Sequence, residues 1–282
     1  MKILAVIVIY NPDWELLGNN IRAFYDHVDG ILVWNNSDAP ICLSDVRELQ
    51  PFFNKTIYKT QHQNVGIAKP LNYAWHYAKE HGYDTLLTMD DDSVFHNFDT
   101  YRQHVDHHWQ QNGLSLCGPT TLATKQTGMR KVHHLITSGM LVPISLLDKA
   151  GGYCQLFHVD GIDIELCINL ACQKIWSYCD YDSLLQQRYG TPATKKWGPI
   201  TLHSPNYSLD RLHDIFCNHI IILRKHHYPL HLLWHIIRLY VIGFVCKGVL
   251  LVENNKKAKL KAVFRGIKDG FKYNIHAKKE AS

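Results

Sequence analysis

The chain has 282 residues, 46% of them hydrophobic, and a formal net charge of +5. A chain of this size and apolar content can bury a large core, which excludes an intrinsically disordered protein. Its eight cysteines form no C-x-x-C pair, and the apolar run near the N-terminus stops at Asn11-Pro12 without a small-residue cleavage site. We therefore expect a reduced, cytoplasmic protein whose thiols are mostly buried.

Short apolar runs alternate with helical spacing over the first ninety residues. Strands are expected at 3–10, 31–34, 56–59 and 85–89, and helices at 14–28 and 64–82. The alternation predicts an α/β fold with an open, mostly parallel central sheet and helices on both faces.

The pattern after residue 99 is less regular. We expect a helix at 101–111, strands at 114–118 and 135–142, a helix at 162–172 and a final helical region at 230–272. No internal repeat or low-complexity tract is present.

Three polar clusters directly follow predicted strands, at residues 10–12, 35–38 and 90–93. The carboxyl ends of parallel strands form one rim, where ligands collect. Asp90, Asp91 and Asp92 repel one another there, and bound Mg²⁺ or Mn²⁺ would relieve the repulsion. In an extended segment Asp90 and Asp92 face one side and Asp91 the other. The alternative is an Asp-rich loop that caps the following helix.

Four motifs occur in a fixed order: IVIYN after the first strand, NNSD after the second, N-x-G-I-A-x-x-L-N at 64–72 and D-x-D-S at 90–93. This order resembles glycosyltransferase family 2, which has the GT-A fold, over about residues 3–225. Within that family the chain looks most like the bacterial rhamnosyltransferase-type enzymes that build cell-surface polysaccharides. The resemblance implies a catalytic domain at 1–225.

The resemblance also assigns roles to matching residues. Asp90 would bind the ribose or the metal, and Asp92 would ligate the Mn²⁺ or Mg²⁺ that bridges the diphosphate. For Asn64 and Asn72, helix capping and a buried hydrogen bond remain an alternative. The residues expected to form the nucleotide pocket are Asn11, Asn36, Asp38, Asn64, Gly66 and Asn72.

Two further segments match the family pattern. Ser138 and Gly139 resemble the family's S-G segment near the donor sugar and acceptor. The stretch HVDGIDIELC at 158–167 resembles the segment that carries the general base, and its register places the base at Asp163, with Glu165 toward the donor. Inverting transfer needs one carboxylate to take the proton of the acceptor hydroxyl. Alternatively, Asp160, Asp163 and Glu165 form an acidic cluster that only stabilises a helix N-terminus.

Other residues depart from the pattern or match it loosely. His203 resembles a histidine that reaches the metal or β-phosphate, and the alternative is a loop histidine. Arg211 resembles a diphosphate-binding arginine. At four positions where the family pattern has arginine or tyrosine, this chain has Asn169, His213, Asp214 and Cys217. The histidines His104, His107 and His108 lie on a polar helix without a metal motif, so we expect a solvated helix face.

The positive charge is concentrated at the C-terminus. Residues 224–282 hold thirteen Lys/Arg and three Asp/Glu, whereas residues 1–223 hold seventeen and twenty-two. Only eight uncharged residues separate Arg238 from Lys247, too few to cross a bilayer. We expect residues 226–282 to form basic amphipathic helices on the anionic inner leaflet of the cell membrane, or a hairpin packed on the domain or in a homodimer.

The predicted function is inverting, metal-dependent transfer of rhamnose or another hexose. The donor would be a dTDP- or UDP-sugar, and the acceptor a glycan or a polyprenyl-linked glycan. One alternative is a degenerate sugar-nucleotide-binding protein, because of Asn169, His213 and Cys217. The other is a nucleic-acid-binding protein, which no recognised RNA- or DNA-binding motif supports.

Overall fold

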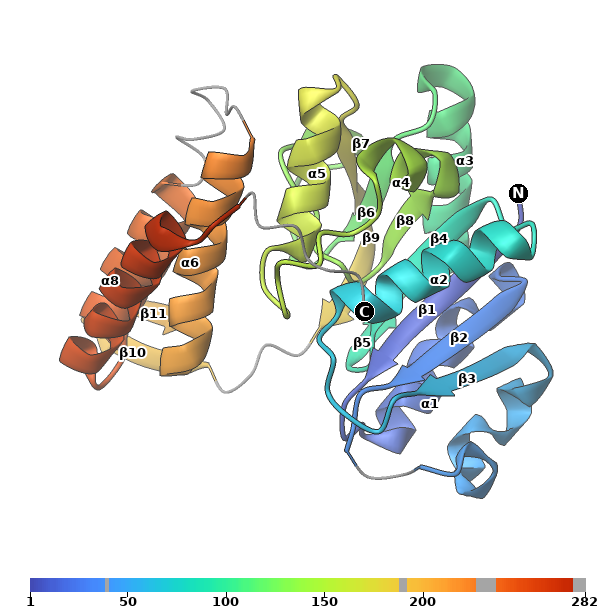
Figure 1. Ribbon diagram of the computed structural model, residues 1–282, viewed down its shortest axis with the longest axis horizontal. Coiled ribbons are helices and arrows are strands. Elements are labelled where there is room, and N and C mark those ends of the chain that lie inside the picture. Colours follow the sequence, from blue (N-terminus) through green and yellow to red (C-terminus); the bar gives the residue numbers. More distant parts are fainter. Residues whose placement is uncertain (39–40, 188–191, 227–236, 276–282) are drawn as a thin grey trace. The chain divides into compact units, whose positions relative to one another are not determined.

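The computed structural model describes residues 1–38, 41–187, 192–226 and 237–275 (Figure 1). The chain divides into two compact units, residues 1–188 and 189–282. The domain boundary expected after residue 225 from charge and motif coverage stays a prediction.

The first unit is built on a nine-stranded sheet with the strand order β3-β2-β1-β4-β8-β6-β9-β5, and β7 pairs with β9. Its parallel part follows the predicted alternation of apolar runs and helices. Nearly every side chain of the central strands β1, β2 and β4 is buried, which explains their continuous apolar sequences. These parallel strands are β1 (Ile3–Ile9), β2 (Gly30–Asn35), β3 (Thr56–Thr60) and β4 (Thr85–Asp90).

The other half of the sheet is mixed. β8 runs antiparallel to β4 and β6, β5 and β7 run antiparallel to β9, and β6 runs parallel to β9. The predicted strand at 135–142 shortens at its start, because residues 137–139 contact the end of β4 instead of joining the ladder. These strands are β5 (Ser93–Phe95), β6 (Leu116–Thr120), β7 (Met129–Val132), β8 (Met140–Pro143) and β9 (Ser177–Gln187).

Helices cover both faces of this sheet, as predicted. On one face α1 (Trp14–Phe24), α3 (Phe98–Asn112) and the 3₁₀ segment η3 (Arg47–Lys55) pack on the odd-numbered side chains of β1. On the other face α2 (Ala68–Glu80) crosses β1 and β4 (Figure 1). The remaining helical segments are α4 (Ile144–Ala150), α5 (Ile162–Cys172), η1 (Tyr25–His27) and η2 (Leu43–Asp45).

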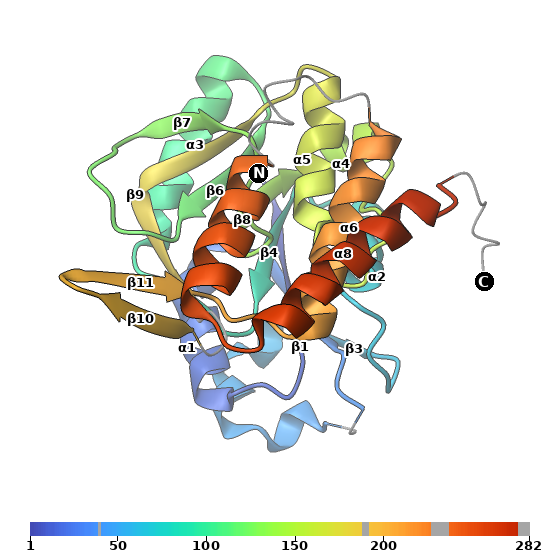
Figure 2. The same ribbon diagram turned by 90° about the vertical axis from the view of Figure 1, so that its left-hand side faces the viewer.

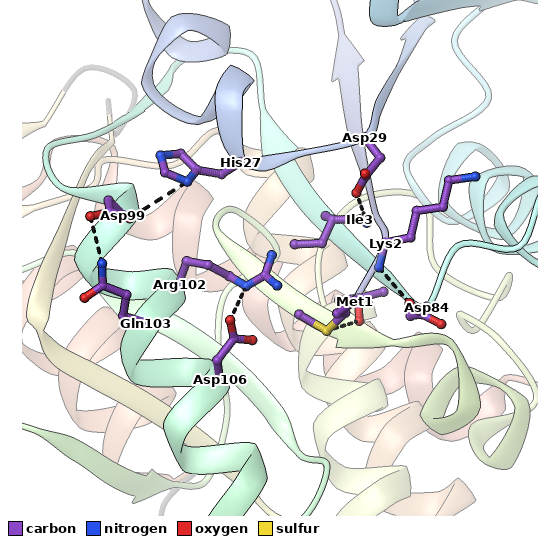
Figure 3. Close-up of polar contacts among 11 residues, drawn as sticks. Met1, Lys2, Ile3, His27, Asp29, Asp84, Asp99, Arg102, Gln103 and Asp106 are labelled. Carbon is purple, nitrogen blue, oxygen red and sulfur yellow. Dashed lines mark hydrogen bonds and ion pairs between the residues drawn. The ribbon is translucent and has the colours of Figure 1, made fainter.

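Two aspartates fix the amino end of β1 (Figure 3). The backbone N–H of Lys2 donates to Asp84 Oδ2 (2.6 Å), and that of Ile3 donates to Asp29 Oδ2 (2.7 Å). These bonds satisfy two backbone N–H groups at the amino end of the strand. They tie β1 to both of its neighbours at the end opposite the predicted ligand rim.

The described part of the second unit combines a hairpin with the helices α6, η4 and α8 (Figure 2). Strand β10 (Ala193–Trp197) pairs antiparallel with β11 (Ile200–Ser204). The helices are α6 (Leu209–Lys225), the π-helix η4 (Ile237–Val252) and α8 (Lys256–Lys272). In the described part of the chain, no helix has both the length and the apolar character needed to cross a membrane.

Close backbone contact holds α6 and α8 together. A Cβ added at Gly266 would lie 2.2 Å from the His213 carbonyl oxygen, and one at Gly270 would lie 2.7 Å from that of Cys217. Beside this contact, Lys259 Nζ bonds to Glu253 Oε2 (2.5 Å), and both side chains are buried. The two glycines therefore fix which face of α8 packs inward.

Replacing Gly266 with alanine tests this packing. In an open helix the change stabilises by about 1 kcal/mol. Here the added methyl group overlaps the His213 carbonyl, so we expect a loss of about 1–3 kcal/mol in chemical denaturation. Lys257→Ala, at an exposed position of the same helix, is the control and should change little. A more stable Gly266→Ala protein would contradict the close approach.

Candidate active site

Three segments converge on Asp90 at the carboxyl end of β4. Its backbone N–H donates to Ser138 Oγ (3.1 Å), and its carbonyl oxygen accepts from Asn20 Nδ2 on α1 (2.7 Å). Its carboxylate Oδ2 accepts from Gln187 Nε2 at the end of β9 (2.8 Å). The position of this carboxylate is therefore set by elements far apart in the sequence.

Asp91 has a different partner. Its Oδ2 accepts the backbone N–H of Tyr10 at the end of β1 (2.9 Å). Burial raises the pKa of Asp91 to about 6, and the nearby charge of Asp92 acts in the same direction. The residues that follow form strand β5, so the alternative in which the three aspartates cap a helix is wrong.

The Ser138-Gly139 segment crosses the end of β4. The Thr88 hydroxyl donates to the Thr137 carbonyl oxygen (2.5 Å), and the Gly139 N–H donates to the Thr88 carbonyl oxygen (2.7 Å). Ser138 is fully buried. Gly139 has φ +81°, and a Cβ there would lie 2.7 Å from Pro119 Cγ. Only glycine fits this left-handed position.

Asp163, the expected base, adjoins the same segment. Burial raises its pKa to about 6, while hydrogen bonds from the backbone of Ile164 and Thr137 oppose that shift. The bond from the Ile164 N–H to Asp163 Oδ1 is 2.8 Å long. Thr137 and Ser138 therefore join the predicted base to the predicted metal-binding end of β4.

Asp163 and Glu165 both lie in the first turn of α5, and Glu165 is buried. A negative charge in this turn also interacts favourably with the helix dipole. The helix-stabilising alternative therefore remains compatible with their positions, and a catalytic role for Asp163 stays a prediction.

The predicted nucleotide pocket contains a connected loop at 64–67. Asn36 Nδ2 donates to the Gly66 carbonyl oxygen (2.8 Å), and the Ile67 N–H donates to the His158 carbonyl oxygen (2.8 Å). Gly66 has φ +75°, and a Cβ there would lie 2.4 Å from that same His158 oxygen. This loop thus links the end of β2 to the segment that precedes α5.

Asn64 and Asn72 both form structural hydrogen bonds, which was the alternative to direct contact with the donor. Asn64 Oδ1 accepts the Gly66 N–H (3.0 Å). The amide of Asn72 bonds in both directions to the backbone of Tyr153, at 2.8 Å each. Donor contacts by these two residues stay predictions, and their bonds give the pocket its internal support.

Asn11 follows β1 and Asp38 follows β2, and both side chains are exposed. Asn11 takes a left-handed conformation with φ +49°, and its N–H donates to Ser37 Oγ (2.8 Å). The ends of β1 and β2 are thereby held together. Both side chains are accessible to a ligand, and their contacts with base and ribose stay predictions.

Other predicted site residues belong to the second unit. His203 is exposed on β11, and Arg211 on α6 has its guanidinium 4.5 Å from the centre of the Tyr207 ring. His213 Nε2 lies 3.0 Å from Asp269 Oδ2 on α8. The predicted contacts of His203 with the metal and of Arg211 with the diphosphate stay predictions, and His213 has a packing role.

A second group that could hold a metal ion lies near the start of β9. One ligand atom from each of His104, Asp180 and Asp182 lies within 4.8 Å of the others. His104 Nδ1 is 2.9 Å from Asp180 Oδ2, which also accepts from the Ser183 hydroxyl (2.6 Å). His104 therefore pairs with a buried aspartate, and the expectation of a merely solvated position is wrong for it.

Gln187 is the site residue that the sequence did not reveal. Its contact with Asp90 spans 97 positions of the chain, and the local sequence LLQQ carries no recognised motif. The one sequence signal for its position is that side chains alternate between the two faces of a strand. This alternation places Gln187 on the same face of β9 as the buried Leu185.

No protein-family model and no curated protein sequence matches the chain. Solved structures do match. S. aureus TarS 1–349 in complex with UDP-GlcNAc has a TM-score of 0.63 and 13% identity, with 95% of this chain and 81% of that chain covered. GalNAc-T7 with UDP, GalNAc and Mn²⁺ has a TM-score of 0.60 and 10% identity, with 96% and 56% covered. The chain therefore has the expected GT-A fold.

The raised pKa of Asp163 predicts how the stability of the folded protein depends on pH. Because the folded-state pKa of about 6 exceeds the ordinary value of 3.8, the folded protein holds this proton more tightly than the unfolded chain does. This contribution is complete below pH 3.8 and is lost as the pH rises through about 6.

Asp163→Asn removes that loss, which is about 3 kcal/mol for a shift of about two pKa units, so its melting temperature should exceed the wild-type value by about 6–12 °C at pH 8 and by much less at pH 4. Asp26→Asn, an exposed carboxylate elsewhere in the first unit, is the control. Equal melting temperatures of wild type and Asp163→Asn at pH 8 would contradict the buried charge.

Proposed function

We propose that this protein is an inverting, metal-dependent glycosyltransferase that moves a sugar from a UDP- or dTDP-linked donor to a hydroxyl group of a glycan. The GT-A fold and the order of the four sequence motifs support this proposal. Its main support is the path of hydrogen bonds from Asp90 through Ser138 and Thr137 to Asp163.

The donor set at the end of β4 suits a hard divalent cation. Asp90 and Asp92 supply carboxylate oxygens, the ligands that Mg²⁺ and Mn²⁺ prefer. Gln187 orients one of these carboxylates through its amide N–H, as outer ligands do in metal sites. Mn²⁺ or Mg²⁺ bound here would neutralise the charge that develops on the leaving diphosphate.

Asp163 would act on the acceptor. The acceptor oxygen attacks the anomeric carbon while the bond from that carbon to the diphosphate oxygen breaks, and the diphosphate keeps the electron pair. Asp163 takes the hydroxyl proton. A pKa of about 6 suits this role, because the carboxylate is ionised at neutral pH and is still more basic than an ordinary aspartate.

The proposed donor and acceptor rest on the ligands of the similar structures and on the sequence motifs. UDP-GlcNAc is bound by TarS, and UDP with GalNAc by GalNAc-T7, which favours a uridine-linked donor here. The motif resemblance favours rhamnose from dTDP and a polyprenyl-linked acceptor in polysaccharide synthesis. A lipid-linked acceptor would bring the protein to the inner face of the cell membrane.

A non-catalytic sugar-nucleotide-binding protein is the second candidate. Asn169 replaces a family arginine, and its Nδ2 donates to the Ala150 carbonyl oxygen (3.0 Å). His213 replaces a family tyrosine and pairs with Asp269. Both side chains therefore have structural roles in this protein. A non-catalytic sugar-nucleotide-binding protein would bind the donor without releasing diphosphate.

A charge placed beside Asp90 tests the metal site. Gln187→Glu replaces the donor that lies 2.8 Å from Asp90 with a second carboxylate, so we expect a loss of about 1–2 kcal/mol in metal-free buffer. Mn²⁺ should recover this loss, because it binds only the folded state. Gln186→Glu is exposed on the opposite face of β9 and is the matched control. No difference between the two variants in their response to Mn²⁺ would remove Asp90 from the metal site.

Turnover tests catalysis itself. We expect metal-dependent release of UDP or dTDP in the presence of acceptor, with a rate that falls about tenfold per pH unit below about pH 6 as Asp163 becomes protonated. Asp163→Asn should reduce this release by about 10²-fold or more while donor binding persists. Binding without any release by the wild type would favour the non-catalytic candidate.

A further inference from the structure

The outer face of α8 carries a stripe that combines cations with exposed aromatic rings. At 100° per residue, its members lie within a sector about 80° wide. Phe264 and Phe271 are 68% and 62% exposed. We call this set the α8 stripe: Lys257, Lys261, Phe264, Lys268 and Phe271, all of them exposed.

The opposite face of α8 is already occupied. Lys259, Ala262, Val263, Gly266 and Gly270 are buried, and the two glycines contact the backbone of α6. Figure 2 shows α8 (red) alongside α6 (orange). Because the inner face is fixed by this close approach, α8 cannot rotate to bury Phe264 or Phe271 within its own unit.

The stripe has no acidic member. Asp269 is the single acidic residue of α8, and its Oδ2 pairs with His213 Nε2 on α6 (3.0 Å). Outside the stripe, Lys256, Arg265 and Lys272 add three more exposed cations to the same helix. The stripe itself therefore carries only positive charge.

We propose that the α8 stripe binds the surface of an anionic lipid membrane, with α8 parallel to the bilayer plane. Lysines attract acidic headgroups, and rings on the same face enter the boundary between headgroups and acyl chains. The helix of 17 residues is about 26 Å long and would lie on the bilayer along its whole length. This inference is independent of the proposed catalytic function.

Charge argues against a second copy of the chain as the occupant. In a twofold-symmetric contact each stripe would face its own copy, and the lysines of both chains would lie against each other. An anionic surface offers the opposite charge to every lysine of the stripe. The stripe therefore fits a membrane better than a homodimer.

Vesicle co-sedimentation of the purified full chain tests the proposal. We expect binding to phosphatidylcholine vesicles with about 30 mol% phosphatidylglycerol at about 0.1 M salt, and little binding to phosphatidylcholine alone. Lys261→Glu/Lys268→Glu and Phe264→Ala/Phe271→Ala should each weaken binding at least tenfold. Their melting temperatures should stay at the wild-type value, because all four side chains are exposed.

Matched controls carry the same changes outside the stripe. Lys125→Glu/Lys174→Glu alters the net charge equally, and Leu114→Ala/Leu122→Ala removes two exposed apolar side chains. Both controls should bind like the wild type. The proposal is overturned if the wild type ignores anionic vesicles, or if controls and stripe variants weaken binding equally. It is also overturned if sedimentation velocity shows a dimer that Phe264→Ala/Phe271→Ala dissolves while vesicle binding is unchanged.

Discussion

The hydrogen bonds between residues 137–139 and the end of β4 hold the candidate site together. They join the Thr88 hydroxyl and carbonyl, the Asp90 N–H and, through Thr137, the Asp163 carboxylate. A residue other than glycine at 139 would overlap Pro119. Two carboxylates with different predicted tasks are thereby fixed to one short segment, so their relative placement does not depend on long, mobile side chains.

The environments of the carboxylates differ in a way that suits those tasks. Asp90 accepts a hydrogen bond from Gln187, whereas burial raises the pKa of Asp163 to about 6. An ionised oxygen is needed to bind a cation, and a more basic carboxylate is needed to accept a proton. Both environments arise near the carboxyl end of β4, because the segment at 137–139 contacts both residues.

Much of the first unit could be predicted because local sequence determines it. The apolar runs at β1, β2 and β4 leave no polar face, so they read as buried parallel strands, and the helix at Ile162–Cys172 was predicted with its observed bounds. The contacts of Gln187 with Asp90 and of His104 with Asp180 could not be predicted. They join residues 97 and 76 positions apart, and they depend on the register of the mixed half of the sheet.

The location of bound manganese tests the central claim most directly. Two groups of side chains in the described part of the chain compete for it, the Asp90/Asp92 pair at the end of β4 and the His104/Asp180/Asp182 group, whose aspartates lie in the first half and at the centre of β9. Anomalous diffraction from crystals grown with UDP and Mn²⁺ should place the metal at ligand distance from Asp90 or Asp92. Manganese found only at His104, Asp180 and Asp182 would contradict the assignment of the β4 end as the metal and diphosphate site.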